Sequence, residues 1–128
     1  MKILDELFYT ENHEWIRQEN GEIVEGITDY AQSELSDIVY IELPEEGVEV
    51  HKGEAIGTIE AVKTVSDLYT ALSGKIVEVN RELEDHPDLI NKDPYDAGWI
   101  VRIKISDPEE LKDLLDAEEY KGIIEREE

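Results

Sequence analysis

The sequence contains no cysteine, and this absence restricts the chemistry that the chain can perform with its own side chains. Without cysteine there is no disulfide framework, no thiol nucleophile and no thiolate metal site. If the protein takes part in sulfur or thiol-based redox chemistry, a cofactor must therefore supply the sulfur. The 128 residues suit one domain, which can bury roughly two-thirds of the surface of the unfolded chain.

Basic residues are also scarce, because 12 lysines and arginines stand against 34 acidic residues, which gives a formal net charge of −22. A field of this sign repels a phosphate backbone, so we exclude binding to nucleic acid. The same field can accelerate encounters with basic surfaces of protein partners. The sequence also has no apolar run of transmembrane length and no signal-peptide pattern over residues 1–6, so we expect a cytoplasmic protein that does not enter a membrane.

Sequence patterns of an active site are missing too. The three histidines, His13, His51 and His86, are scattered, and none has a second ligand at the spacing of a metal site. There is no Gly-x-Ser-x-Gly nucleophile elbow, and Gly53 and Gly57 lie in a strand context, which argues against a phosphate-binding loop. We therefore expect neither a metal site nor catalysis by the side chains of this chain.

What the sequence does contain is a series of short alternating segments that predict β-strands. Asn20-Gly21 is the strongest hairpin signal, because both residues tolerate positive φ. Thr28 or Asp29 is expected to cap a short helix that ends near Leu35. We predict strands over residues 13–17, 21–27, 38–43, 74–80 and 99–105, and a further hairpin that turns near residues 61–64.

Helical segments are expected only at the edges of the strands. One helical turn is predicted at residues 87–90, within a polar connection. Near the C-terminus, Asp107 followed by Pro108 is typical of the start of a helix. A second helix is predicted over residues 117–124. The apolar residues of the first of these two helices are expected on one face, at Leu111, Leu114 and Leu115.

Many short strands with few helices indicate a mainly β fold, either a sandwich or a flattened barrel. We predict a single domain over residues 1–128, with residues 107–128 forming a helical extension that packs on it. The strand pattern alone does not distinguish among β folds.

A single lysine, Lys63, lies where two of the predicted strands meet. Residues 61–64 include no Gly, Pro, Asn or Asp, the residues that normally form a turn. A requirement other than turn formation therefore determines which residues occupy these positions. A lysine at the tip of a hairpin is presented to solvent, where its amine is readily acylated. Lys63 is therefore either an ordinary exposed lysine or a site of covalent attachment.

The surrounding motifs favour attachment. Turns that end at Gly47 and Gly74 flank the hairpin, and this plan resembles the lipoyl-attachment region of lipoyl domains. The resemblance extends from about Tyr9 to Tyr120, which is nearly the whole chain, and it is specific to the glycine cleavage H-protein family. Four segments carry it, in the order found in the family: residues 24–32, 37–44, 60–63 and 93–100.

This resemblance implies a hybrid of barrel and sandwich with a lipoyl group attached to Lys63. It also implies a carrier that is not itself a catalyst and that moves the aminomethyl group of glycine among three partners. These are a pyridoxal-phosphate decarboxylase (P protein), a folate-dependent aminomethyltransferase (T protein), and the flavin enzyme dihydrolipoyl dehydrogenase (L protein), whose final acceptor is NAD. A lipoylating enzyme would be a fourth partner, and we expect the chain to be a monomer.

The resemblance further implies roles for three acidic residues. Glu60 and Asp67 flank Lys63 and are expected to help the lipoylating enzyme recognise the tip. Glu14 and Asp67 are expected to border a cleft in which the loaded arm rests, because carboxylates there would attract its cationic amine. The alternative interpretation is that these acids are solvated charges on strands.

The sequence departs from the family pattern at several positions. Ala61 stands where serine is usual, Ala71 where proline is usual, and Ser36 where glycine is usual before an acidic residue. Asn12 and Glu34 differ from the residues common in the cleft, where position 34 is often histidine.

Because two of these departures lie in the cleft, an H-like paralogue that acts as a lipoyl donor or in sulfur metabolism stays open as an alternative. An interaction module with an unmodified Lys63 is a second alternative. A biotin carrier is a poor match, because Val62-Lys63-Thr64 stands where that family usually has Met-Lys-Met.

Overall fold

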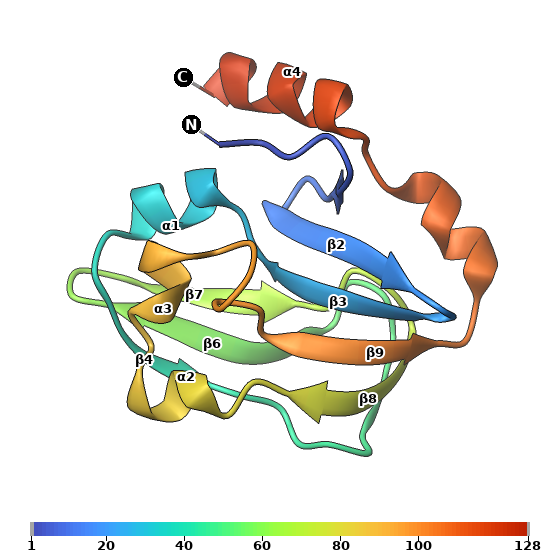
Figure 1. Ribbon diagram of the computed structural model, residues 1–128, viewed down its shortest axis with the longest axis horizontal. Coiled ribbons are helices and arrows are strands. Elements are labelled where there is room, and N and C mark those ends of the chain that lie inside the picture. Colours follow the sequence, from blue (N-terminus) through green and yellow to red (C-terminus); the bar gives the residue numbers. More distant parts are fainter. Residues whose placement is uncertain (1, 128) are drawn as a thin grey trace.

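Two antiparallel β-sheets form the centre of the molecule, which the computed structural model describes from residue 2 to residue 127. The larger sheet has six strands in the order β1-β2-β3-β9-β8-β5, and the smaller has three in the order β4-β6-β7. The predicted mainly β fold is thereby confirmed (Figure 1). The strands are β1 (Phe8–Tyr9), β2 (Glu14–Glu19), β3 (Glu22–Ile27), β4 (Ile38–Glu42), β5 (Glu49–Val50), β6 (Ala55–Ala61), β7 (Val65–Tyr69), β8 (Gly74–Val79) and β9 (Val101–Ile105).

The hairpin between β2 and β3 forms where the sequence predicts it. Asn20 and Gly21 connect the strands with φ of 49° and 82°, and Glu19 pairs with Glu22 across the turn. Two consecutive residues with positive φ match the right-handed twist of the flanking strands. Strand β3 then pairs with β9, and β9 with β8, so the hairpin anchors one half of the larger sheet.

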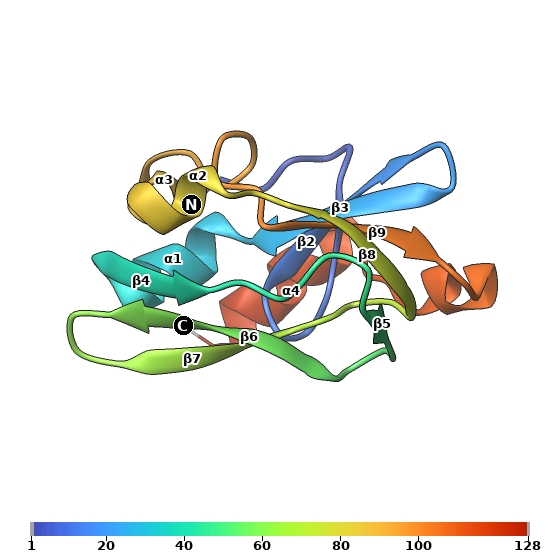
Figure 2. The same ribbon diagram turned by 90° about the horizontal axis from the view of Figure 1, so that it is seen from below.

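Aliphatic side chains from both sheets fill the space between them. Ile16 and Ile23 of the larger sheet and Ile41, Ile59 and Leu68 of the smaller one belong to one cluster, and each is at most 2% exposed. Burial of each such side chain contributes roughly 1.5–3 kcal/mol. The two layers are visible in Figure 2, with β6 and β7 below and β3 and β9 above.

A second, aromatic cluster lies on the opposite face of β2 and β3, where the C-terminal helix α4 (Ala117–Glu127) packs (Figure 1). The rings of Tyr9 and Tyr120 stack in parallel with their centroids 4.5 Å apart. The backbones of Tyr9 and Leu115 exchange two hydrogen bonds of 2.8 Å each. Ring stacking and strand-like pairing thus join the C-terminal segment to the N-terminal one.

The short helices lie at the edges of the sheets, as the sequence predicts, but their bounds differ in part. Helix α1 (Asp29–Leu35) is capped by Thr28, whose hydroxyl accepts a hydrogen bond of 3.2 Å from the N–H of Ala31. Helix α2 (Glu82–Asp85) has no counterpart in the sequence prediction, and α3 (Leu89–Lys92) overlaps the turn predicted at residues 87–90 but is shifted by two residues toward the C-terminus. No helix within residues 2–127 is long and apolar enough to cross a lipid bilayer.

The prediction that three leucines share one face of a helix after the last strand is wrong. The segment η1 (Pro108–Asp113) is a 3₁₀ helix, and it is followed by Leu114 in an extended conformation. Leu115 pairs with Tyr9 instead of continuing the helix, so tertiary pairing ends the helix before the leucines can align. The next helix, α4, continues to Glu127 and does not end at Ile124.

Ser36, directly after α1, has a backbone conformation that suits glycine, with φ of 65° and ψ of −150°. A residue with a Cβ in this region carries about 1–3 kcal/mol of strain. We expect Ser36→Gly to raise the free energy of unfolding by about 1 kcal/mol, since the added freedom of the unfolded chain offsets part of the relief. Chemical denaturation measures this change.

Ser33→Gly is the matched control, because it makes the same substitution inside α1, where the backbone is helical. Glycine in a helix is unfavourable, so this variant should be less stable than the parent protein by roughly 0.5 kcal/mol. A Ser36→Gly variant that is no more stable than the parent would show that the strain at Ser36 does not exceed the entropy cost of glycine in the unfolded chain.

Candidate functional site

Lys63 lies in the tight connection between β6 and β7, at one end of the smaller sheet (Figure 2). The side chains of residues 62–65 are all exposed, and Val62 and Val65 are exposed to 67% and 60%. Within residues 2–127, the amine of Lys63 has no hydrogen-bond or ion-pair partner. The predicted hairpin is therefore confirmed, and its lysine is free to react.

The tip of this hairpin turns without any residue in the left-handed conformation, since no residue of the segment 61–64 has a positive φ. The N–H of Ala61 donates a hydrogen bond of 2.8 Å to the carbonyl of Thr64 and closes the loop. The N–H of Val62 donates a bond of 3.0 Å to the carbonyl of Asp37, which directly precedes β4. The neighbouring strand thus supports the tip, which explains why no turn-forming residue is needed.

The two acids predicted to flank the lysine lie on one face of the smaller sheet. Glu60 pairs with Val65 and Asp67 pairs with Thr58, so the alternation of the strands places the two carboxylates at diagonal positions. Asp67 is exposed, Glu60 is partly exposed, and the hydroxyl of Tyr69 donates to Asp67 at 3.4 Å. Both acids are therefore accessible on the hairpin that bears Lys63.

A pocket of about 170 Å³, here called the α1 cleft, lies among α1, the start of β2 and the hairpin strands β6 and β7. It brings together Glu14 and Asp67 with Asn12 and Glu34, two of the positions that depart from the family pattern. No lysine or arginine is among the described residues that line it. Its apolar wall includes Ile27, Leu35 and Ile59, and its acids are Glu14, Glu34 and Asp67.

Glu14, the first residue of β2, is only 3% exposed. One carboxylate oxygen accepts a hydrogen bond of 2.9 Å from the hydroxyl of Thr10, and the other accepts one of 3.1 Å from the N–H of Tyr69. Burial raises the pKa of Glu14 to about 7, although both hydrogen bonds act in the opposite direction. Glu14 thus titrates in the physiological range while it ties β2 to the end of β7.

A second buried carboxyl group, that of Glu25 in β3, has no role in the sequence analysis. It is 0% exposed; Oε1 accepts a hydrogen bond of 3.0 Å from the N–H of Ala71, and Oε2 has no partner within residues 2–127. Burial, and after it the charge of Glu14, raises the pKa of Glu25 well above its ordinary value. In the sequence, Glu25 is a single acidic residue among apolar residues of a predicted strand. The alternation of that strand does not show whether its side chain points into the core.

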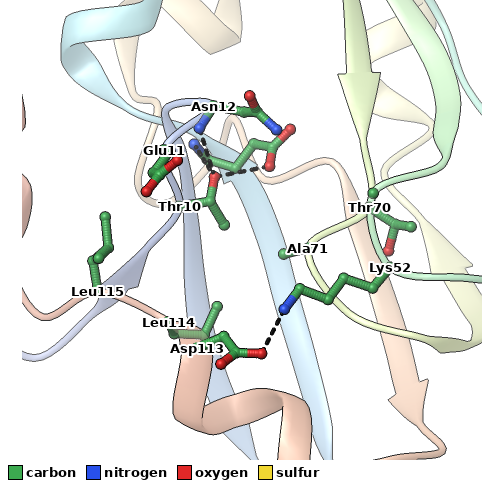
Figure 3. A pocket seen from close by; sticks show the side chains of 11 residues that line it. Thr10, Glu11, Asn12, Lys52, Thr70, Ala71, Asp113, Leu114 and Leu115 are labelled. Atoms are coloured by element: carbon green, nitrogen blue, oxygen red, sulfur yellow. Dashed lines mark hydrogen bonds and ion pairs between the residues drawn. The ribbon is translucent and has the colours of Figure 1, made fainter.

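Glu14 also lines a second, larger pocket of about 310 Å³ (Figure 3). There the amine of Lys52 forms an ion pair of 2.7 Å with Asp113, and the side chain of Lys52 extends toward η1. Leu114 contributes apolar surface to this pocket. The one lysine near Glu14 in this pocket is therefore already paired with another carboxylate.

The histidines are not gathered into a site. His13 contacts the hydroxyl of Tyr120 at 2.9 Å and the carboxylate of Glu127 at 2.9 Å, so it links the start of β2 to α4. His51 and His86 are exposed. Within residues 2–127, no group of three or more potential ligands is arranged to hold a metal ion.

With this geometry established, comparison with known proteins assigns the family. The family model described as "Glycine cleavage H-protein" matches residues 7–127. The chain belongs to the glycine cleavage H-protein family. It is 49% identical over 128 residues to the glycine cleavage system H protein of Anaeromyxobacter sp. (strain K), with 100% of both chains covered. It is 50% identical over 124 residues to that of Staphylococcus epidermidis, with 97% of this chain and 98% of the relative covered.

A crystal structure of a glycine cleavage system H protein from Mycobacterium marinum has the same fold. The two structures superimpose with a TM-score of 0.83 at 40% sequence identity, and the match covers 94% of this chain and 97% of the other. The likeness of this chain to the H-protein fold is thereby confirmed.

As a member of the H-protein family, the chain is a lipoyl carrier of the glycine cleavage system and not itself a catalyst. Proteins of this family carry the lipoyl group on a lysine. They work with the decarboxylase, the aminomethyltransferase and dihydrolipoyl dehydrogenase. The resemblance inferred from the sequence motifs is confirmed at the level of family and function.

Proposed function

We propose that Lys63 is the residue to which the lipoyl group is attached. The observation that carries this proposal is the exposed position of Lys63 at the tip of the β6–β7 hairpin, with an amine that has no partner within residues 2–127. Amide formation there breaks no side-chain interaction among the residues that the structure describes. When attached, the lipoyl group supplies the disulfide chemistry that a chain without cysteine lacks.

The hairpin contributes rigidity beneath a flexible arm. Hydrogen bonds to Thr64 and Asp37 fix the backbone on the N-terminal side of Lys63. A long arm on such a base has a high effective concentration in the active site of any enzyme that docks the carrier. Val62 and Val65 are exposed beside Lys63, so they can make apolar contacts with these partners.

The α1 cleft is suited to shelter the arm when it carries its cargo, the aminomethyl group. The apolar wall formed by Ile27, Leu35 and Ile59 suits a hydrocarbon chain, and the carboxylates of Glu14 and Asp67 suit a cationic amine. Glu34 adds a third carboxylate at the position where the family often has histidine. The departure at position 34 therefore increases the acidity of the cleft and remains compatible with a cationic cargo.

Glu60 and Asp67 are proposed to be recognised by the lipoylating enzyme. Both lie on the accessible face of the lysine hairpin, where a basic surface of a partner can meet them. The net charge of −22 favours encounter with such a surface over long distances. We also propose a cytoplasmic location, because the H proteins to which the chain is similar are bacterial and NAD-linked metabolism in bacteria takes place in the cytoplasm.

The attachment site is tested by producing the protein with an active lipoyl ligase and lipoate, followed by intact mass measurement and peptide mapping. We expect one lipoyl-sized increment, located on the peptide that contains Lys63. An increment on a different lysine, or an unmodified protein in the presence of a ligase that modifies a control acceptor, would refute the proposal.

A further inference from the structure

Glu14 and Glu25, here called the carboxyl pair, hold the segment that follows the lysine hairpin. They come from neighbouring strands: Glu14 pairs with Ile27 and Glu25 pairs with Ile16, so the two acids occupy diagonal positions on one face of the larger sheet. Glu14 accepts from the N–H of Tyr69 at 3.1 Å and Glu25 from the N–H of Ala71 at 3.0 Å. The larger sheet thus accepts hydrogen bonds from two alternate backbone N–H groups, that of the last residue of β7 and that of the second residue after it.

The two members of the carboxyl pair have unequal surroundings. Glu14 receives two hydrogen bonds and lines both pockets, whereas Glu25 is 0% exposed, receives one hydrogen bond and has a buried oxygen with no partner within residues 2–127. An unpaired carboxylate oxygen in the core is far more costly than an unpaired neutral hydroxyl. Protonation of Glu25 therefore relieves the more unfavourable of the two sites.

Among the described residues that line the two pockets around Glu14, no free cation is available to compensate a second negative charge. Lys52, the one lysine that lines a pocket beside Glu14, is already paired with Asp113 at 2.7 Å. His13 is bound to Tyr120 and Glu127. The remaining ionisable residues that line the two pockets around Glu14 are Glu11, Tyr30, Glu34 and Asp67, none of them a cation, and the hydroxyl of Tyr69 binds Asp67.

We propose that Glu25 is a positioning residue for Glu14: in its protonated form it holds the segment directly after β7 through Ala71 and leaves the single negative charge of the carboxyl pair on Glu14, at the α1 cleft. This inference rests on the proposed use of the cleft by the cationic cargo. The two carboxyl groups then have different roles: Glu14 provides the negative charge that attracts the cargo, and Glu25 fixes the position of the neighbouring backbone. The pKa of Glu25 is raised by burial and by the charge of Glu14, which agrees with Glu25 keeping its proton while Glu14 ionises.

The proton arrangement is tested on the unmodified protein by carboxyl ¹³C NMR, with glutamate labelled at Cδ and the two signals assigned from Glu14→Gln and Glu25→Gln. We expect the Glu14 signal to titrate near pH 7, and the Glu25 signal to stay in its protonated position throughout the titration of Glu14. In Glu25→Gln, the titration midpoint of Glu14 should move by less than about one unit, since glutamine imitates the protonated acid. If Glu25 ionises before Glu14, the proposal is wrong.

The positioning role is tested on the lipoylated carrier loaded by the decarboxylase, with the half-life of the cargo followed by intact mass. Glu25→Gln keeps an acceptor for the N–H of Ala71 and should retain the half-life and its pH profile within about twofold. Glu25→Leu removes that acceptor and should shorten the half-life at least fivefold, with faster amide hydrogen exchange at Tyr69 and Ala71. Equal half-lives for the leucine and glutamine variants would overturn the positioning role.

Two controls separate the possible failures. Glu49→Gln removes one charge from an exposed position on β5 and should change neither the NMR titration nor the half-life. If Glu25→Leu does not fold, the NMR result for Glu25→Gln still decides the proton arrangement. Because that titration needs no lipoyl group, a failure of the Lys63 proposal would leave it unaffected, and the two proposals can fail independently.

Discussion

Replacing Lys63 with arginine is expected to abolish both lipoylation and carrier function while the fold is retained. An arginine side chain stays protonated and is not acylated under the conditions that modify a lysine amine. Arginine nevertheless keeps the positive charge and the length of the side chain, and position 63 is exposed. We expect no lipoyl increment by intact mass, and glycine cleavage in the reconstituted system at the level measured without any carrier.

The matched control is Lys75→Arg, which makes the same substitution at an exposed position of β8. This variant should gain one lipoyl group and support glycine cleavage as the parent protein does. Both variants should unfold within about 2 °C of the parent, because surface substitutions of this kind rarely change stability by more than about 0.5 kcal/mol. Lipoylation of the Lys63→Arg variant would show that the attachment site lies elsewhere.

The parts of the fold that depend on local chemistry could be predicted from the sequence. Asn20 and Gly21 form the β2–β3 turn through their own tolerance of positive φ, and Thr28 caps α1 through its own hydroxyl. The exposed lysine hairpin could also be located, because alternating apolar residues on both sides of Lys63 indicate two strands that must turn between them. Each of these features involves residues close together in sequence.

The parts that depend on contacts between distant residues could not be predicted in this way. Leu115 follows the helical pattern expected from its neighbours, yet it pairs with Tyr9 from the other end of the chain. The tip at residues 61–64 is supported by the hydrogen bond from the N–H of Val62 to the carbonyl of Asp37. No turn-forming residue in the loop indicates this contact in the sequence. Tertiary hydrogen bonds of this kind override local preference without leaving a local signature.

The candidate site divides along the same line. Lys63, Glu14, Glu60 and Asp67 could be named from the resemblance to the H-protein family, and the structure places Glu14 and Asp67 in one cleft. Glu25 could not be named, because in a strand that is buried on both faces the alternation of residues does not reveal which acid enters the core. Its significance follows only from the amide of Ala71 and from the proximity of Glu14.

Removing two of the three carboxylates of the α1 cleft, those of Glu14 and Asp67, is expected to shorten the half-life of the cargo on the carrier at least about tenfold. An ammonium group about 4 Å from a carboxylate gains about 1 kcal/mol in water and about 4 kcal/mol at the effective dielectric of a protein surface. The double variant Glu14→Gln with Asp67→Asn loses this attraction twice, but glutamine still offers an oxygen to the N–H of Tyr69. The loaded arm should therefore leave the α1 cleft more often and expose its cargo to water.

The pH dependence gives this prediction a second, independent measurement. Burial raises the pKa of Glu14 to about 7, so the parent protein gains the attraction as pH rises through 7 and loses it as Glu14 is protonated below that value. The half-life of the cargo should fall between pH 8 and pH 6 in the parent protein and should be nearly flat in the double variant. Intact mass measured over time at each pH follows the loss of the aminomethyl group.

Glu42→Gln provides the control for the charge itself. Glu42 lies in the same row of the smaller sheet as Thr58 and Asp67 and is exposed, but it does not line the α1 cleft. Glu42→Gln removes one negative charge from the smaller sheet, as Asp67→Asn alone does, without touching the cargo, so the half-life should stay within about twofold of the parent value. If the half-life of the cargo is the same in the double variant as in Glu42→Gln, the carboxylates of Glu14 and Asp67 do not protect the cargo. Apolar burial of the arm would then be what protects it.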